Sequence, residues 1–159
     1  MASEFDLTSE EGLEAFRTAC EVPRDVIIGP YEEGMDRPVG SVIISSYMLR
    51  EVGLRFPIPK DLCYLLDGLR MTLECCRPNV LQLLLGVALA NHRLNIFLGD
   101  RELLANYSFG MNNEELYFQV SPSGRNLIAE IERMQNRNWR QFPMVVVSGS
   151  CCQKGKSSQ

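Results

Sequence analysis

The sequence contains few of the residues on which catalytic and metal sites depend, with one histidine, His92, and one tryptophan among its 159 residues. A cysteine nucleophile needs a base, and His92 stands two residues beyond an apolar helical stretch. A zinc site could draw only on His92 with Cys63, Cys75 and Cys76, whose spacing lacks the close ligand pair of structural zinc sites. We therefore expect buried cysteines and a histidine at a helix end, with neither a zinc site nor cysteine catalysis.

The sequence also lacks the signals of secretion and of membrane insertion. Residues 1–14 are acidic and interrupted, so they do not form the basic and apolar regions of a signal peptide. The longest apolar stretch, Val80 to Ala90, is shorter than the roughly 18–20 residues that span a bilayer, and Gln82 and Gly86 interrupt it. The six cysteines do not have the spacing of a disulfide framework. We expect an intracellular protein, of the nucleus or the cytoplasm, that is neither secreted nor inserted in a membrane.

Carboxylates are present, but their positions do not predict a two-metal site. Strand transfer would need three carboxylates converging on two metal ions about 4 Å apart. Asp61 and Asp100 stand where helices would start, and Asp67 and Glu102 fit solvated helix faces. A second incomplete pattern joins Gly149 to a later Gly-Lys-Ser, but five residues separate the two glycines where a phosphate loop has four. We expect no catalytic, metal or cofactor site.

The net charge of −4 is unevenly distributed. Residues 1–36 contain ten acids and two bases, a balance of −8, whereas residues 37–159 contain fourteen bases and ten acids, a balance of +4. The basic excess lies mostly in residues 125–159, and it is far below that of a nucleic-acid-binding protein.

One basic segment keeps nucleic-acid binding open as a second hypothesis. Arginines alternate with aromatic rings there, and such a surface can hold phosphates and stack bases; the candidate contacts are Arg125, Arg133, Arg137, Trp139 and Arg140. In the interpretation that we favour, Trp139 and Phe142 pack beneath a sheet while the arginines remain in water.

The stretch from Arg77 to Ala90 predicts a buried helix. Pro78 suits the first helical position, and the apolar residues that follow occupy every side of a 3.6-residue helix, as they do in a helix buried in a core. Arg77 then takes the N-cap position, where serine is a better residue. Arg77→Ser is therefore expected to stabilise the domain by about 1 kcal/mol.

The remaining elements follow from periodicity, caps and turn residues. Helical spacing predicts helices over residues 9–20, 45–52, 60–69, 95–104 and 127–134. Gly53 is the expected C-cap of the second of these helices, although residues 42–44 also favour a strand and the last segment could in part be extended. β-branched residues predict strands over residues 26–28, 116–120 and 142–147. Turn residues predict exposed loops over residues 31–40 and 110–113.

The fold class that these elements predict is α+β. We expect a mainly helical single domain over residues 9–149, built around a buried central helix at about 78–91. A small antiparallel sheet would pair about 116–120 with 143–147. Residues 1–8 would form a frayed N-terminus and residues 150–159 a disordered polar tail.

Six landmarks occur in an order that is similar to a known family. They are Val22-Pro23-Arg24-Asp25-Val26, the segment Gly53 to Pro59, Pro78-Asn79 followed by Leu84-x-Gly86, Tyr117-Phe118, Gly124-Arg125, and Trp139-Arg140 leading into Met144 to Gly149. Over roughly residues 8–149 the chain resembles the globular domain of plant gypsy-type transposon proteins. It departs from them at Arg77 and Leu81, where members usually have a hydroxyl residue and a tryptophan.

The resemblance implies a retrotransposon-derived plant protein with no catalytic residues to transfer. Together with the missing catalytic constellation, it leads us to expect a non-enzymatic assembly or protein-interaction domain. The partner would be an unknown protein or a second copy of the chain. The alternative is a nucleic-acid-binding module that uses the basic and aromatic residues 125–142.

Overall fold

The computed structural model describes residues 5–113, 115–128, 139 and 141–149. The chain divides into two compact units, which are described separately. Unit 1 contains the residues up to Lys60 together with those from Asn136 onward, and unit 2 runs from Asp61 to Gln135. A single domain over residues 9–149 stays a prediction. Residues 1–4 and the tail 150–159 lie outside the described part, and within residues 5–8 the side chain of Leu7 is buried.

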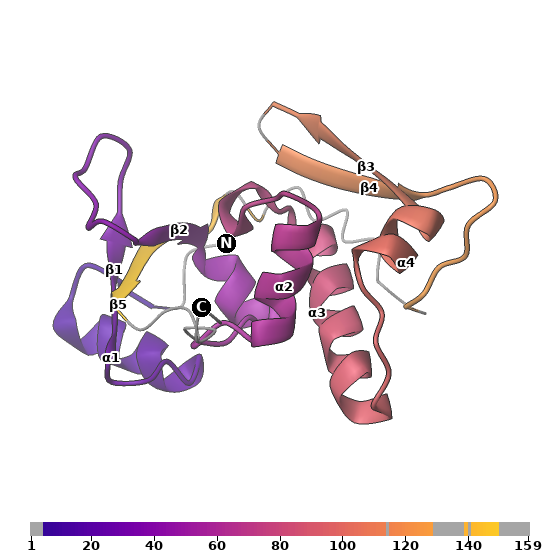
Figure 1. Ribbon diagram of the computed structural model, residues 1–159. Helices are drawn as coiled ribbons and strands as arrows, with labels where there is room; N and C mark the ends of the chain where they lie inside the picture. The colour runs from indigo at the N-terminus through magenta and orange to yellow at the C-terminus, as the bar shows by residue number, and fades with distance from the viewer. Residues whose placement is uncertain (1–4, 114, 129–138, 140, 150–159) are drawn as a thin grey trace. The chain divides into compact units, whose positions relative to one another are not determined.

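Unit 1 contains a three-stranded antiparallel sheet (Figure 1). Its strands are β1 (Val26–Tyr31), β5 (Met144–Gly149) and β2 (Val42–Ser45), and β5 lies between the other two. Val145 and Val147 of β5 are two residues apart and therefore on one face of the sheet. Both are completely buried, so this face of the sheet belongs to the core.

The predicted pairing of residues 116–120 with residues 143–147 is wrong. β5 pairs with β1 along one edge and with β2 along the other. Residues 116–120 lie instead in β4 (Glu115–Val120), whose partner is β3 (Tyr107–Asn112). A β-branched run identifies a strand but not its partner. Here the two early runs at residues 26–28 and 42–44 both pair with β5, which lies about a hundred residues later in the chain.

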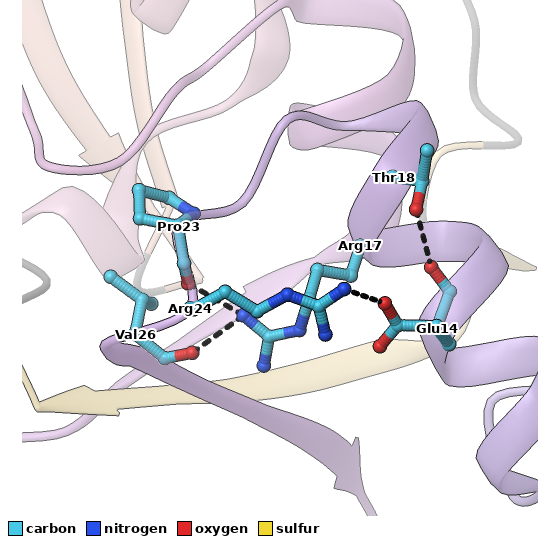
Figure 2. Close-up of polar contacts among 6 residues, drawn as sticks. All are labelled: Glu14, Arg17, Thr18, Pro23, Arg24 and Val26. Atoms are coloured by element: carbon cyan, nitrogen blue, oxygen red, sulfur yellow. Dashed lines mark hydrogen bonds and ion pairs between the residues drawn. The ribbon is translucent and has the colours of Figure 1, made fainter.

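The first helix of unit 1, α1 (Glu10–Ala19), begins as predicted. The hydroxyl of Ser9 accepts a hydrogen bond from the Gly12 N–H at 3.0 Å and caps the helix. Near the other end, Arg17 Nη1 donates to the carbonyl oxygens of Pro23, at 2.6 Å, and Val26, at 2.8 Å (Figure 2). This one side chain satisfies two carbonyls of the turn that leads into β1.

A short helical segment follows β2 directly. Residues 46–47 are helical and continue into η1 (Met48–Val52), so the helix predicted over residues 45–52 is confirmed for residues 46–52, and Ser45 belongs to β2. Gly53 takes the left-handed conformation, with φ of 86°, and ends the segment as predicted. Tyr47 is 2% exposed, and its ring meets that of Phe142 edge-on at 5.0 Å.

Unit 2 is built from helices followed by a hairpin (Figure 1). Its elements are α2 (Lys60–Gly68, whose first residue belongs to unit 1), the turn η2 (Leu73–Cys75), α3 (Pro78–Leu94), α4 (Asp100–Asn106), β3 and β4. The helix α3 starts at the predicted proline and continues to Leu94, beyond the predicted end at about Asn91. Val80, Leu83 and others along it are buried, but Leu89 and Leu94 are exposed. A helix buried on every side at the centre of the fold is therefore not confirmed.

The β3–β4 hairpin occupies residues that the sequence in part assigns to a loop. Phe109 lies opposite Phe118, and Gly110 lies opposite Tyr117. The Tyr117 ring covers Gly110 so closely that a Cβ there would lie 2.5 Å from the phenolic oxygen. Gly110, a residue type typical of turns, is therefore a strand residue beneath an aromatic ring. The loop predicted over residues 110–113 is wrong for residues 110–112, which belong to β3.

The α+β class is confirmed, since the described residues contain α-helices together with antiparallel sheets. The narrower description, mainly helical with one small sheet, is not confirmed. Among the described residues, no helix is long and apolar enough to cross a membrane.

Candidate protein-interaction site

Four large apolar side chains of unit 2 are exposed on neighbouring segments. Leu94 is 66% exposed, Ile96 43%, Phe97 70% and Tyr64 58%. The Tyr64 ring, on α2, meets the Phe97 ring at 5.9 Å in an edge-on arrangement. We call these four residues the apolar surface. Exposed apolar side chains that gather, rather than occurring singly, mark contact sites on proteins.

The loop that carries Phe97 is fixed by the end of α3. The helix ends at Asn95, which takes the left-handed conformation with φ of 50°. The side chain of Asn91 then accepts a hydrogen bond from the Leu98 N–H at 2.8 Å, and its amide donates to the Leu98 carbonyl at 2.9 Å. This pair of bonds imitates the pairing of two strands. The Phe97 side chain is therefore held outward by a fixed loop.

A groove of about 410 Å³ lies between the hairpin and the segment that follows α2. We call it the hairpin groove. Its apolar lining comes from Leu69, Met71, Phe109, Met111 and Leu116. Arg70 also lines it, and this residue takes the left-handed conformation with φ of 56° at the end of α2. The groove therefore combines a mainly apolar wall with one basic residue.

Two adjacent thiols lie beside this groove. Cys75 Sγ and Cys76 Sγ both donate to the Thr72 carbonyl, at 3.0 and 3.5 Å. Burial raises the pKa of the Cys76 thiol to about 12, and Cys75 beside it adds to the shift. A thiol with so high a pKa is protonated at neutral pH and is a poor nucleophile. The expectation of a buried free cysteine is confirmed for Cys76.

Unit 1 has a hollow of about 460 Å³ that is lined by residues of α1 and by Arg24. Its two cations are already engaged (Figure 2). Arg17 donates to the turn carbonyls described above, and Arg24 Nη2 forms an ion pair with Glu14 Oε1. An anion that entered this hollow would therefore meet two arginines that already contact other groups.

The residues predicted to contact nucleic acid fall in both units. Arg125 of unit 2 is exposed, and its backbone N–H donates to Asn106 Oδ1 at 2.9 Å. Trp139 of unit 1 is half-buried, and its carbonyl accepts from Ser45 Oγ at 3.0 Å. The other three candidates, Arg133, Arg137 and Arg140, lie outside the described residues. Nucleic-acid contact by this set stays a prediction.

The acidic candidates take structural positions. Asp61 and Asp100 lie in the first turns of α2 and α4, as expected, and Asp67 is exposed. The sequence predicts Glu102 on a solvated face, but its Oε2 accepts from the Gly99 N–H at 2.8 Å and caps α4. This bond lowers the pKa of the Glu102 carboxyl. In the described part of the chain, no three acidic, cysteine or histidine side chains gather as a metal site would require.

The apolar surface is the feature that the sequence interpretation missed. Helical spacing predicts a helix over residues 95–104, but residues 95–99 lie between α3 and α4. The signal that was present is Asn91 followed closely by Asn95, since asparagine readily takes the left-handed conformation at a helix C-terminus. It predicts a helix end at this point.

Comparison of the chain with protein-family models, with curated proteins and with solved structures gave no match in any of the three. The resemblance to the plant gypsy-type transposon domain stays a prediction.

Proposed function

We propose that this chain is a non-enzymatic protein-interaction domain that makes contact through the apolar surface of unit 2. The observation that supports the proposal is Phe97, which is 70% exposed although its loop is held by two hydrogen bonds to Asn91. Water around an exposed phenyl ring is released when a partner covers it. A loop that is already ordered also loses little conformational entropy on binding.

Aromatic side chains are frequent anchors of protein interfaces because each buries a large area with few rotatable bonds. The Tyr64 and Phe97 rings contact each other edge-on, and Leu94 and Ile96 are exposed on the chain segment that carries Phe97. The partner that we propose is a second copy of the chain or another intracellular protein. If the chain is derived from a plant retrotransposon, as the sequence resemblance implies, contact between copies of the chain would serve assembly.

Amide hydrogen exchange tests the proposal. Residues 91–98 should exchange more slowly in concentrated than in dilute solutions of the purified chain, or when a captured protein partner is present. The exposed residues 32–40 of unit 1 provide the internal control and should not change. Equal exchange under all these conditions, with no partner captured, contradicts the proposal.

Nucleic-acid binding is the second candidate, and the exposed guanidinium of Arg125 is the observation that favours it. Phosphate-driven binding weakens steeply as the salt concentration rises. If the chain shows no salt-sensitive binding to DNA or RNA at low salt, this candidate is excluded.

A further inference from the structure

We infer that the hairpin groove binds an extended peptide segment of a partner protein, one that has large apolar side chains and an acidic residue that pairs with Arg70. The inference rests on the proposed function, because it assumes that the domain acts through protein contacts. It deepens that function by assigning a second contact site and the chemistry of its occupant.

The apolar lining of the groove indicates that its occupant has large apolar side chains. The volume of the groove, about 410 Å³, lies within the roughly 300–1,000 Å³ that is typical of binding pockets. Met71 and Met111 stand among the lining residues. Methionine is unbranched and polarizable, so its side chain adapts to apolar groups of different shape. Such a wall suits the varied side chains of a peptide better than one rigid small molecule.

The hairpin indicates that the bound peptide is extended. Phe109, Gly110 and Met111 are consecutive in β3, and all three line the groove. Because side chains alternate between the faces of a strand, three consecutive lining residues place main chain as well as side chains in the wall. Leu116, which lies opposite Met111 on β4, also lines the groove, so both strands of the hairpin contribute to this wall. A peptide in an extended conformation can follow such a wall and place alternate side chains against it.

The charge of the lining indicates that the peptide has an acidic residue. Arg70 is the charged residue of the lining, and among the described residues its guanidinium makes no ion pair. The carboxylate of Glu115, the residue before the lining residue Leu116, is engaged by Arg77 Nε at 2.8 Å. Asp67 and Glu74 are exposed on the segments around Arg70 and do not line the groove. A partner carboxylate would therefore complement the cation at this wall, and a partner cation would not.

The backbone holds Arg70 in place. Its N–H donates to the Asp67 carbonyl at 3.0 Å, and the next N–H, of Met71, donates to the Leu66 carbonyl at 2.9 Å. These bonds close the C-terminus of α2 with Arg70 in the left-handed conformation. The start of the arginine side chain is therefore fixed relative to the groove, which favours recognition of a carboxylate at one position of the peptide.

Selection from a displayed library of random peptides tests the inference. The full chain should enrich peptides that combine large apolar residues with an aspartate or glutamate at a constant spacing. On Arg70→Glu the acidic preference should change to lysine or arginine. For a synthetic peptide made from the consensus, Arg70→Gln should weaken binding about tenfold, which corresponds to about 1.4 kcal/mol.

Two control variants separate the groove from the rest of unit 2. Arg101→Glu changes another exposed arginine outside the lining, and Phe97→Ser changes the apolar surface. Both should leave the selected consensus unchanged. The inference is overturned if no peptide is enriched, if the acidic preference persists on Arg70→Glu, or if enrichment needs Phe97 instead of Arg70. In the last case the proposed function stands and the groove is not its site. Hydrogen exchange of residues 91–98 is a separate test of the proposed function.

Discussion

Arg77 Nε donates to Glu115 Oε2 across 2.8 Å and thereby links the start of α3 to β4. Both side chains are partly buried, at 34% and 18% exposed. The pair changes what is expected at the N-cap of α3. Serine at position 77 would gain a capping hydroxyl but lose this ion pair. In addition, the Val80 N–H, one of the donors that a cap would satisfy, is already bound by Asn79 Oδ1 at 2.9 Å.

Arg77→Ser is therefore predicted to leave the free energy of unfolding nearly unchanged or to lower it by about 1 kcal/mol, against the gain expected from sequence. In a Glu115→Ala background, where the ion pair is already absent, the same substitution should be more favourable by about 1 kcal/mol. Urea unfolding of the two single variants and the double variant measures this coupling. Equal effects of Arg77→Ser in both backgrounds would show that the pair contributes nothing.

Gly12 provides a case in which helix propensity and packing oppose each other. Alanine in a helix is favoured over glycine by about 1 kcal/mol. However, a Cβ at position 12 would lie 1.9 Å from the backbone oxygen of Asp6, which Ser9 also contacts. We predict that Gly12→Ala lowers the free energy of unfolding by about 2 kcal/mol, because overpacking outweighs propensity.

The matched control for Gly12 is Gly29, in β1, where an added Cβ meets no atom within 4 Å. Gly29→Ala should be neutral or stabilise the protein by about 0.5 kcal/mol. Urea unfolding measures both variants, and a stabilising effect of Gly12→Ala would contradict the close packing of the Asp6 carbonyl against position 12.

Two neighbouring arginines of unit 1 should differ in importance (Figure 2). Arg17 makes two charge-assisted bonds to main-chain carbonyls of Pro23 and Val26. Arg24 pairs with Glu14 at an exposed position, with the two side chains 79% and 47% exposed. Arg17→Met should cost about 2 kcal/mol of stability, and Arg24→Met less than about 1 kcal/mol. Thermal or urea unfolding compares the two, and similar losses would refute the assigned role of Arg17.

The raised pKa of the Cys76 thiol predicts how the free energy of unfolding changes at alkaline pH. Its pKa is about 12 in the folded chain against an ordinary 9.0, so between these values the unfolded chain loses the proton first. The unfolded state then binds fewer protons than the folded state, and stability falls as pH rises, by up to about 1.4 kcal/mol per pH unit. Below pH 9 this contribution is fully present.

The variant Cys76→Ala isolates that contribution, since other alkaline groups titrate in both proteins. It should be less stable than the original chain at neutral pH, because a buried side chain is lost. From about pH 9 upward its stability should fall less steeply. Parallel stability curves from urea unfolding over this range would contradict a buried, protonated Cys76.

The local elements of the fold were largely predictable from sequence, because caps and β-branched runs act locally. Ser9 and Gly53 are found at the helix ends where their residue types predict them. The pairing of β5 was not predictable, since a run such as Met144 to Val147 is compatible with several partners. β3 was missed because Gly110 and Asn112 are turn residues by type, and only the Tyr117 ring on the opposite strand explains the glycine.

The candidate site was less predictable than the fold. An apolar residue such as Phe97 is typical of a core in a sequence pattern. It lies outside the core because residues 95–99 form a loop between α3 and α4 and not the first turn of a helix. Arg70 likewise follows a helix in the sequence with nothing to mark it. Its position in the groove depends on Phe109 and Met111, which lie about forty residues later.

Sedimentation velocity across a range of protein concentrations tests the central claim most directly. The weight-average sedimentation coefficient of the purified chain should rise with concentration, and Phe97→Ser should abolish the rise. Val39→Ser, which removes a fully exposed apolar side chain of unit 1, should behave like the original chain. A chain that stays monomeric at high concentration and captures no protein through Phe97 would contradict the account.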